Sequence, residues 1–215
     1  MGYRQAVRQR ILIPSFAGSN PATLVLYHKV YIALWFFILY SIYGGDFLLI
    51  TDLTMNKEYF TEKNIKYVDL NSKKIGNCKG CFCCWTKTPG KCVIRDDATK
   101  IYTDIAKTDF IIYVSKVVFG CYDTPVKNLM ERSLPVQKAF IRIHEGETHH
   151  FQRDVALKKA FIIAYGAETD LEKETFKKLV ERNSKNMSFT SYDIIFTNEK
   201  EVENIAKKVV EQWKK

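Results

Sequence analysis

The stretch Asp109-Phe-Ile-Ile-Tyr-Val-Ser115 is a short and almost unbroken apolar run, and it decides the fold class because four similar runs accompany it. These are Phe47–Leu53, Ile65–Leu70, Ala160–Tyr165 and Tyr192–Phe196. A strand of a parallel sheet is covered on both faces, so its sequence is continuously apolar instead of alternating. The five runs therefore predict five parallel strands.

Segments with helical signals lie between these runs. Residues 97–106 carry apolar side chains on one face, and Thr124 precedes a proline that opens a second helix. Thr169 and Glu172 form a capping box before a third helix, and Asn198 is placed to cap a fourth. Strands that alternate with helices predict an α/β fold, a doubly wound sheet with right-handed crossovers.

Two connections depart from this alternation. Residues 54–64 are too few for a full helix, so we expect a short or irregular one there. Residues 133–158 form a long insert, a loop or hairpin that would cover the site or meet a partner subunit. The insert holds His149 and His150, which belong either to an ordinary polar loop or to an anion or metal site. We assign residues 47–215 to one domain that contains this insert.

Residues 1–46 do not resemble the rest of the chain. They contain one acidic residue, at the last position, and an uncharged apolar run from Val30 to Tyr43. Gly18-Ser-Asn-Pro21 is what the T-arm of a transfer-RNA gene gives when translated, and Gly44-Gly-Asp46 matches a translated ribosome-binding sequence. We interpret the region as a non-native or disordered extension from an over-extended gene prediction, with the true start close to residue 48. A signal anchor over the apolar run and a genuine extra helix are the alternatives.

The chain has a net charge of +9, which raises the question of a nucleic-acid partner or another anionic ligand. Lysines are spread along predicted helix faces, such as Lys173, Lys177 and Lys208, and no basic stripe alternates with aromatic residues. We therefore expect no nucleic-acid partner, and interpret the surplus as a solvated surface that also attracts an anionic cofactor. No Ser–His–Asp order, catalytic carboxylate pair or P-loop is present, which argues against hydrolase and phosphotransfer chemistry.

The cysteines are the strongest chemical signal. Cys78, Cys81, Cys84 and Cys92 fall in a fifteen-residue window with Cys83 among them, so one of the six cysteines lies elsewhere. Thiolates at such intervals on a loop with glycine and proline can meet around one metal centre. Three interpretations stay open: a [4Fe–4S] cluster, a structural or redox-active thiol loop, and a zinc site.

The segments after the second and third runs carry a family resemblance, through Gly80–Phe82, Cys84–Gly90, Cys92–Asp97, Phe119–Lys127 and Glu131–Ser133. They resemble the flavodoxin-like, NAD(P)H-dependent FMN reductases, in the branch that includes the iron–sulfur flavoproteins. The likeness covers about residues 47–215, and residues 78–135 are its specific part. It implies a three-layer sandwich around a five-stranded parallel sheet in the order 2-1-3-4-5, with FMN at the strand ends, and a homodimer or homotetramer.

The resemblance also implies site residues. Those that would contact the flavin or border its site are Thr51, Thr54, Trp85, Ser115, Phe119, Gly120, Tyr122 and Gly166. The possible cluster ligands are Cys78, Cys81, Cys84 and Cys92, on a loop that would face the Phe119–Tyr122 turn at the mouth of the sheet. No catalytic residue is implied.

One stretch departs from the family pattern. After the first strand the family has a glycine-rich phosphate loop that leads into a long helix, whereas this chain has Thr51-Asp-Leu-Thr-Met-Asn56. Thr51 and Thr54 offer hydroxyl donors, but the carboxylate of Asp52 would repel a phosphate if it faced inward. We therefore expect cofactor binding to be altered at this point.

The sequence and the resemblance together predict a cytoplasmic, FMN-dependent oxidoreductase. It would take electrons from NAD(P)H and pass them to a small molecule, to a protein acceptor or to a cluster. The alternative is a flavodoxin-fold electron carrier, or a redox or metal-binding protein that uses the cysteine loop without enzymatic turnover. Both remain open because a fold alone does not establish a function.

Overall fold

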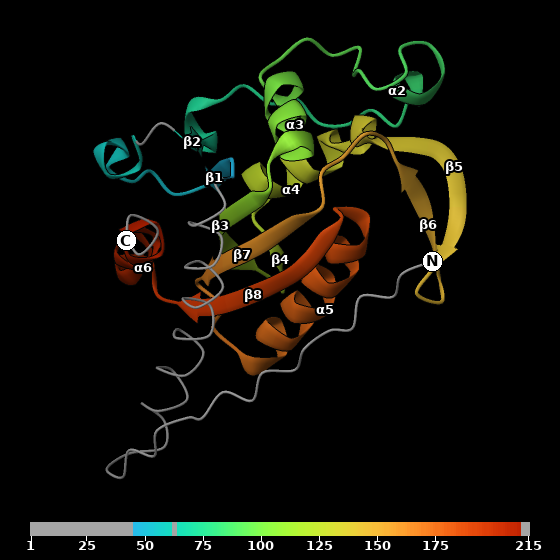
Figure 1. Ribbon diagram of the computed structural model, residues 1–215. Helices are drawn as coiled ribbons and strands as arrows, with labels where there is room; N and C mark the ends of the chain where they lie inside the picture. Colours follow the sequence, from blue (N-terminus) through green and yellow to red (C-terminus); the bar gives the residue numbers. More distant parts are fainter. Residues whose placement is uncertain (1–44, 62–63, 212–215) are drawn as a thin grey trace, which may run out of the picture.

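The computed structural model describes residues 45–61 and 64–211, and a parallel sheet runs through its centre (Figure 1). The strands of this sheet are β1 (Phe47–Thr51), β2 (Ile65–Asp69), β3 (Phe110–Val118), β7 (Lys158–Tyr165) and β8 (Phe189–Thr197). They pair in parallel in the order β2-β1-β3-β7-β8, which confirms the predicted order 2-1-3-4-5. The predicted extension over residues 1–46 lies, apart from its last two residues, outside the described part of the chain.

Helices and single turns connect the strands. They are η1 (Lys57–Phe60), η2 (Leu70–Ser72), α2 (Cys83–Thr86), α3 (Ala98–Lys107), α4 (Thr124–Arg132), η3 (Leu134–Val136), α5 (Asp170–Asn186) and α6 (Glu199–Glu211). The predicted capping box is confirmed, because the Glu172 amide donates to Thr169 Oγ1 at 3.2 Å and the Thr169 amide donates to the Glu172 carboxylate at 3.1 Å. The predicted cap at Asn198 is confirmed by a bond from the Glu201 amide to its Oδ1.

The central strands β1, β3 and β7 are buried on both faces, as their sequences predict, whereas the edge strands β2 and β8 are largely half-buried. In β1, Leu48 and Ile50 pack into the core beneath α3, α4 and α5. Phe47 and Leu49 point the other way, into a core that η1 and α6 cover. Figure 1 shows these helices on the two sides of the sheet. The link between β1 and β2 holds only the single turn η1, so the first long helix of a doubly wound fold is replaced by one turn.

The insert after α4 forms a hairpin that stands apart from the main sheet. Its strands β5 (Gln137–His144) and β6 (Glu147–Gln152) pair with each other in antiparallel fashion. Figure 1 shows the hairpin projecting from the end of the molecule that also carries α2. A second small addition, β4 (Cys121–Tyr122), folds back on the end of β3.

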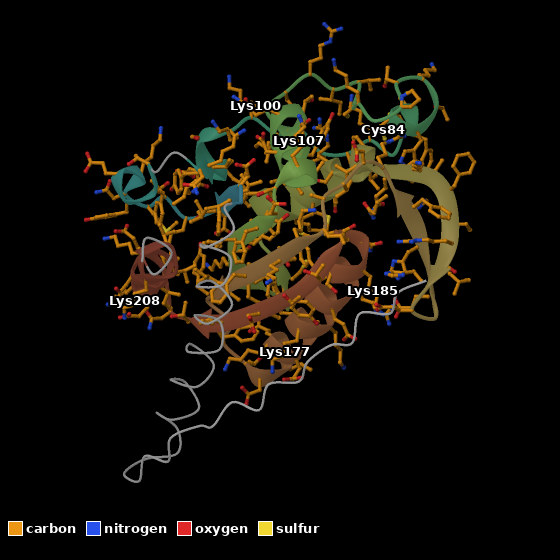
Figure 2. The ribbon with its side chains drawn as sticks, viewed as in Figure 1. Cys84, Lys100, Lys107, Lys177, Lys185 and Lys208 are labelled. Atoms are coloured by element: carbon orange, nitrogen blue, oxygen red, sulfur yellow. The ribbon has the colours of Figure 1, made fainter. Side chains whose placement is uncertain are left out.

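The described residues have two further features, one concerning membrane-spanning helices and the other the placement of the lysines. No helix in residues 45–61 or 64–211 is both long and apolar enough to cross a membrane, and the run from Val30 to Tyr43 lies outside these ranges. Lysines are distributed over the surface: Figure 2 labels Lys100 and Lys107 on α3, Lys177 and Lys185 on α5, and Lys208 on α6.

One lysine is different, because Lys158 at the start of β7 is only 1% exposed. Its ammonium donates to the carbonyl of Ala156 at 2.5 Å and to that of Met187 at 3.4 Å. Burial lowers the pKa of Lys158 from 10.5 to about 8, although the nearby negative charge of Asp109 raises it. The folded protein therefore releases this proton at a lower pH than the unfolded chain does.

We expect the free energy of unfolding to rise by about 2 kcal/mol between pH 7 and about pH 9.5, because above pH 8 the unfolded chain holds a proton that the native state has lost. Lys158→Met should abolish this rise and should itself be more stable than the wild type at pH 7. Urea denaturation at the two pH values measures both effects. Lys178→Met, at an exposed position of α5, is the control and should keep the rise. An equal rise in Lys158→Met would contradict the assignment.

Candidate functional site

The cysteine loop runs from residue 73 to residue 97, between η2 and α3, and turns sharply at three points. Gly80, Phe82 and Gly90 have positive φ angles of 60°, 55° and 84°. Glycine adopts this left-handed backbone without strain, whereas Phe82 is held in it by the turn that follows. The carbonyl of Phe82 accepts hydrogen bonds from the amides of Trp85 and Thr86 at 2.9 and 3.1 Å. These turns fold the loop back on itself.

A buried arginine ties both ends of this loop to the end of α4. The guanidinium of Arg132 donates to both carboxylate oxygens of Asp96, at 2.6 and 2.9 Å, and to the carbonyl of Gly76 at 2.6 Å. The Arg132 side chain is fully buried and that of Asp96 is 13% exposed. Burial raises the pKa of Asp96, but hydrogen bonds from Arg132 and the Gly76 amide, with the arginine charge, hold it below its ordinary value.

The folded loop encloses a small cavity of about 30 Å³. The cysteines on its wall are Cys78, Cys81, Cys84 and Cys92, the four that the spacing singled out. Cys83 belongs to the same turn but is not part of this wall. Apolar side chains, including Trp85 and Leu134, complete the lining. The wall thus includes four of the five cysteines of the loop, and Figure 2 places Cys84 in this loop at the outer end of the molecule.

The thiols influence one another electrostatically. Burial raises the pKa of Cys84, and the negative charges that Cys92, Cys78 and Cys81 acquire on ionisation raise it further. The exposed Cys81 behaves in the opposite way, because hydrogen bonds from the amide and thiol of Cys83 lower its pKa. Four thiolates this close repel one another unless a cation stands between them. The arrangement therefore favours either neutral thiols or a positively charged centre.

The three interpretations of the cysteines differ in geometry. Within the described part of the chain, no group of three or more His, Cys, Asp or Glu side chains is close enough to hold one metal ion. Zinc needs its four thiolates around one point, so this arrangement does not favour zinc. A [4Fe–4S] cluster needs one thiolate at each iron, so its ligands are spread around a larger body. The cavity has room for about one water, so the loop would have to widen around a cluster.

The other candidate region is the carboxyl edge of the sheet, and Asp52 occupies it. Asp52 directly follows β1 and is 8% exposed. Its carboxylate accepts hydrogen bonds from Ser115 Oγ at 2.9 Å, from the Lys116 amide at 2.9 Å and from Tyr165 Oη at 3.0 Å. Burial raises the pKa of Asp52 in spite of these bonds, and the charge of Asp123 adds to the increase.

The hydroxyls predicted to hold a phosphate are also engaged within the protein. Thr51 Oγ1 donates to the Leu53 carbonyl at 2.7 Å, and Thr54 Oγ1 donates to Asp69 at 3.0 Å. In a flavodoxin-like sheet the FMN lies at the point between β1 and β3 where the strand order reverses. Here a carboxylate stands at that point and takes up the donors. The residues present at this edge do not fit the phosphate of FMN.

The turn predicted to flank the flavin lies against α5. Phe119 and Gly120 have positive φ angles of 51° and 72°, and Phe119 is 91% exposed. A Cβ atom on Gly120 would come within 2.7 Å of Thr175, so this glycine is required for packing against α5. Tyr122 is buried and packs edge-on against Phe176, with ring centroids 4.8 Å apart. Tyr122 is a core residue, and Phe119 is free to meet another molecule.

The structure separates this turn from the cysteine loop. The turn precedes the first residue of α4, whereas Arg132, the last residue of α4, binds the base of the cysteine loop. A helix of this length spans about 13 Å. The loop was expected to face the turn at the mouth of the sheet, and this expectation is corrected: α4 runs back along the sheet and carries the loop away. Gly166 stays at the carboxyl edge, beside Lys116.

Trp85 contacts the hairpin instead of the sheet edge. Its indole Nε1 donates to the carbonyl of Leu134 at 3.3 Å, and its ring lies 4.7 Å from that of His150 and 5.5 Å from that of Phe82. Its predicted contact with a flavin remains a prediction. The structural parts played by Arg132 and His150 could not be predicted from the sequence. Arg132 falls within Glu131–Ser133, one of the segments that carry the family resemblance, but that signal does not identify its partner.

Comparisons with known proteins show a partial sequence match to two relatives and a wider match of the fold. No protein-family model matches the chain. An iron–sulfur flavoprotein from Methanocaldococcus jannaschii is 37% identical over 75 residues, 35% of this chain and 38% of the relative. An iron–sulfur flavoprotein from Archaeoglobus fulgidus is 34% identical over 71 residues, 33% of this chain and 31% of the relative. The match thus spans well under half of either relative. Over that stretch the predicted likeness to iron–sulfur flavoproteins is confirmed.

Solved structures match over most of the chain at low sequence identity. An azoreductase from Bacillus anthracis superposes with a TM-score of 0.51 at 11% identity, covering 80% of this chain and 98% of that one. An NAD(P)H:quinone oxidoreductase from Methanothermobacter marburgensis gives a TM-score of 0.51 at 10% identity, with 80% and 96% covered. These similarities confirm the flavodoxin-like fold.

We expect Arg132→Met to lower the free energy of unfolding by about 3 to 5 kcal/mol, because it leaves the carboxylate of Asp96 buried without its partner. Urea denaturation measures the loss. Lys127→Met is the matched control, since its ion pair with Glu131 on the same helix is exposed and 4.0 Å long. The control should change stability little. Equal effects of the two variants would contradict the role of Arg132.

We expect the wild-type chain to bind FMN no more tightly than riboflavin, because Asp52 leaves the phosphate no donors. Asp52→Ser should free those donors and make FMN bind at least about tenfold more tightly than riboflavin. Flavin fluorescence titrations measure both affinities. Asp170→Ser removes an exposed carboxylate at the start of α5 that holds none of these donors, and it should leave the ratio unchanged. A wild-type preference for FMN as strong as that of Asp52→Ser would contradict this interpretation of the edge.

Proposed function

We propose that the chain is an electron-transfer protein of the oxidoreductase class, whose redox centre is a [4Fe–4S] cluster held by Cys78, Cys81, Cys84 and Cys92. The observation that carries the proposal is that these four thiols, without Cys83, line one enclosed cavity. The sequence match to iron–sulfur flavoproteins supports it. A cluster of this kind would supply transfer of single electrons.

The residues around the cavity have definite tasks in this proposal. The four thiolates would each bind one iron. The positive charge of Arg132, whose pKa is raised by its contacts with Asp96 and Cys92 against the effect of burial, offsets the negative charge of the thiolates. The Tyr102 hydroxyl accepts a hydrogen bond from the Cys92 amide at 3.1 Å and fixes the last ligand against α3. Trp85 and Leu134 keep water from the inner side of the site.

This proposal does not include the predicted reduction of FMN by NAD(P)H. The fold supports a flavin-dependent oxidoreductase that draws electrons from NAD(P)H, but Asp52 stands where the FMN phosphate would bind. The proposal is therefore confined to electron transfer at the cysteine site, with a small molecule or a protein as the partner. A cytoplasmic location and a homodimer or homotetramer remain predictions.

A second candidate function is thiol redox chemistry without a metal. The observation that favours it is the contact between Cys81 and Cys83, which lowers the pKa of the exposed Cys81 thiol. A thiol with a lowered pKa is the more reactive nucleophile and is more readily oxidised. Oxidation of Cys81 and Cys83 to a disulfide would transfer two electrons and two protons to the disulfide of another molecule, which becomes two thiols.

Anaerobic reconstitution with iron and sulfide distinguishes the two candidates. We expect a broad absorption in the visible range, about four irons and four sulfides per chain, and a paramagnetic signal after one-electron reduction. Cys78→Ser, Cys81→Ser, Cys84→Ser and Cys92→Ser should each lose most of the absorption.

Cys83→Ser is the matched control, since Cys83 shares the turn but not the cavity, and it should keep the absorption. Equal loss in Cys83→Ser, or a colourless wild type, would contradict the cluster. A colourless wild type whose Cys81 thiol is alkylated faster than the others would favour the thiol pair.

A further inference from the structure

A cavity lies between α4, α5 and the hairpin, outside the cysteine site and the sheet edge. Its volume is about 760 Å³, which falls in the range of roughly 300 to 1,000 Å³ typical of small-molecule sites. Much of its wall is apolar, from Tyr122, Met130, Leu134, Leu179 and Met187. The proposed function does not use this cavity.

The charges on the cavity wall cancel locally. Lys127 pairs with Glu131 on α4 at 4.0 Å. Arg182 of α5 pairs with Glu147 of the hairpin at 3.4 Å. Lys185, which is outside the wall, lies between Glu147 at 3.2 Å and Glu145 at 3.9 Å. An anionic or cationic ligand would have to compete with these pairs, whereas an uncharged ligand would not. The wall therefore favours an uncharged molecule.

Two histidines of β6 line the cavity and differ in their partners. The ring nitrogens of His149 are both engaged, Nδ1 with Asn186 Oδ1 at 2.9 Å and Nε2 with Glu147 Oε2 at 3.0 Å. In contrast, His150 Nδ1 is buried and has no hydrogen-bond partner in the described part of the chain. Because His150 is part of the cavity wall, its ring is placed to meet a molecule in the cavity. A ligand with one polar edge would satisfy it.

The cavity shares a wall with the cysteine site. Leu134 lines both cavities. Trp85, on the cysteine side, donates to the Leu134 carbonyl and lies 4.7 Å from the ring of His150, on the other side. Two aromatic rings and one leucine thus separate the four thiols from the larger cavity. A molecule seated there would be next to the proposed redox centre.

We propose that this cavity binds an uncharged, planar aromatic ligand with a carbonyl or ring-nitrogen edge, held between the apolar walls and hydrogen-bonded by His150. A planar ring suits the space beside the imidazole of His150 and the side chains of Leu179 and Met187. The proposal rests on the proposed function only where it makes this ligand the redox partner of the cysteine site.

The test is a fluorescence titration of the full chain with lumichrome, an uncharged three-ring compound with carbonyl and ring-nitrogen edges and no phosphate. We expect saturable binding with one site per chain, in the presence and in the absence of iron. Leu179→Trp, which fills the cavity from α5, should abolish binding. Lys178→Trp is the matched control, since Lys178 is exposed on the same helix and outside the cavity, and it should bind as the wild type does.

His150→Phe provides the second variant, because it keeps a ring against Trp85 and removes the nitrogen. We expect about tenfold weaker binding together with an unchanged or higher melting temperature, since the nitrogen has no partner in the free protein. Unchanged lumichrome affinity in both His150→Phe and Leu179→Trp would overturn the proposal. So would a Leu179→Trp variant that alters only self-association in sedimentation, because the cavity would then be an interface. Lumichrome binding does not need the cluster, so failure here leaves the cluster test unaffected.

Discussion

The ion pair between Arg132 and Asp96 is the contact on which the arrangement of the candidate site depends. The arginine is fully buried at the end of α4 and binds both ends of the cysteine loop through Asp96 and the Gly76 carbonyl. Removing these charges from water has a high cost, which two short hydrogen bonds to one carboxylate offset. Because the pair fixes the loop beside Leu134 and His150, it also sets the position of the four thiols relative to the larger cavity.

The carboxyl edge of the sheet and the cysteine loop indicate different chemistry. The strand order provides the crevice where flavodoxin-like proteins hold FMN, yet Asp52 fills it and binds Ser115, Lys116 and Tyr165. The four cysteines that the spacing singles out, by contrast, line one small cavity, and their role as cluster ligands remains a prediction. The flavodoxin-like fold thus has a sheet edge at which Asp52 disfavours a phosphate, and a separate loop in which four thiols line one cavity. Function has to be argued from each region separately.

Much of the fold could be predicted from the sequence because its signals are local. Five apolar runs predicted the five strands, three of which are buried on both faces, and Thr169 with Glu172 predicted the start of α5. The four cysteines could be singled out by spacing alone. The position of their loop could not, because it depends on a contact between Asp96 and Arg132, which lie 36 residues apart. Gly120 was assigned to a cofactor, whereas its neighbour is Thr175, brought close only by the packing of α5.

The mass of the intact chain after anaerobic reconstitution tests the central claim most directly, because each interpretation of the cysteines gives a different mass. The account predicts one added species, with the mass of four irons and four sulfides, displacing the thiol protons of Cys78, Cys81, Cys84 and Cys92. Addition of a single zinc, or no addition beyond the loss of two protons on oxidation to a disulfide, would contradict it.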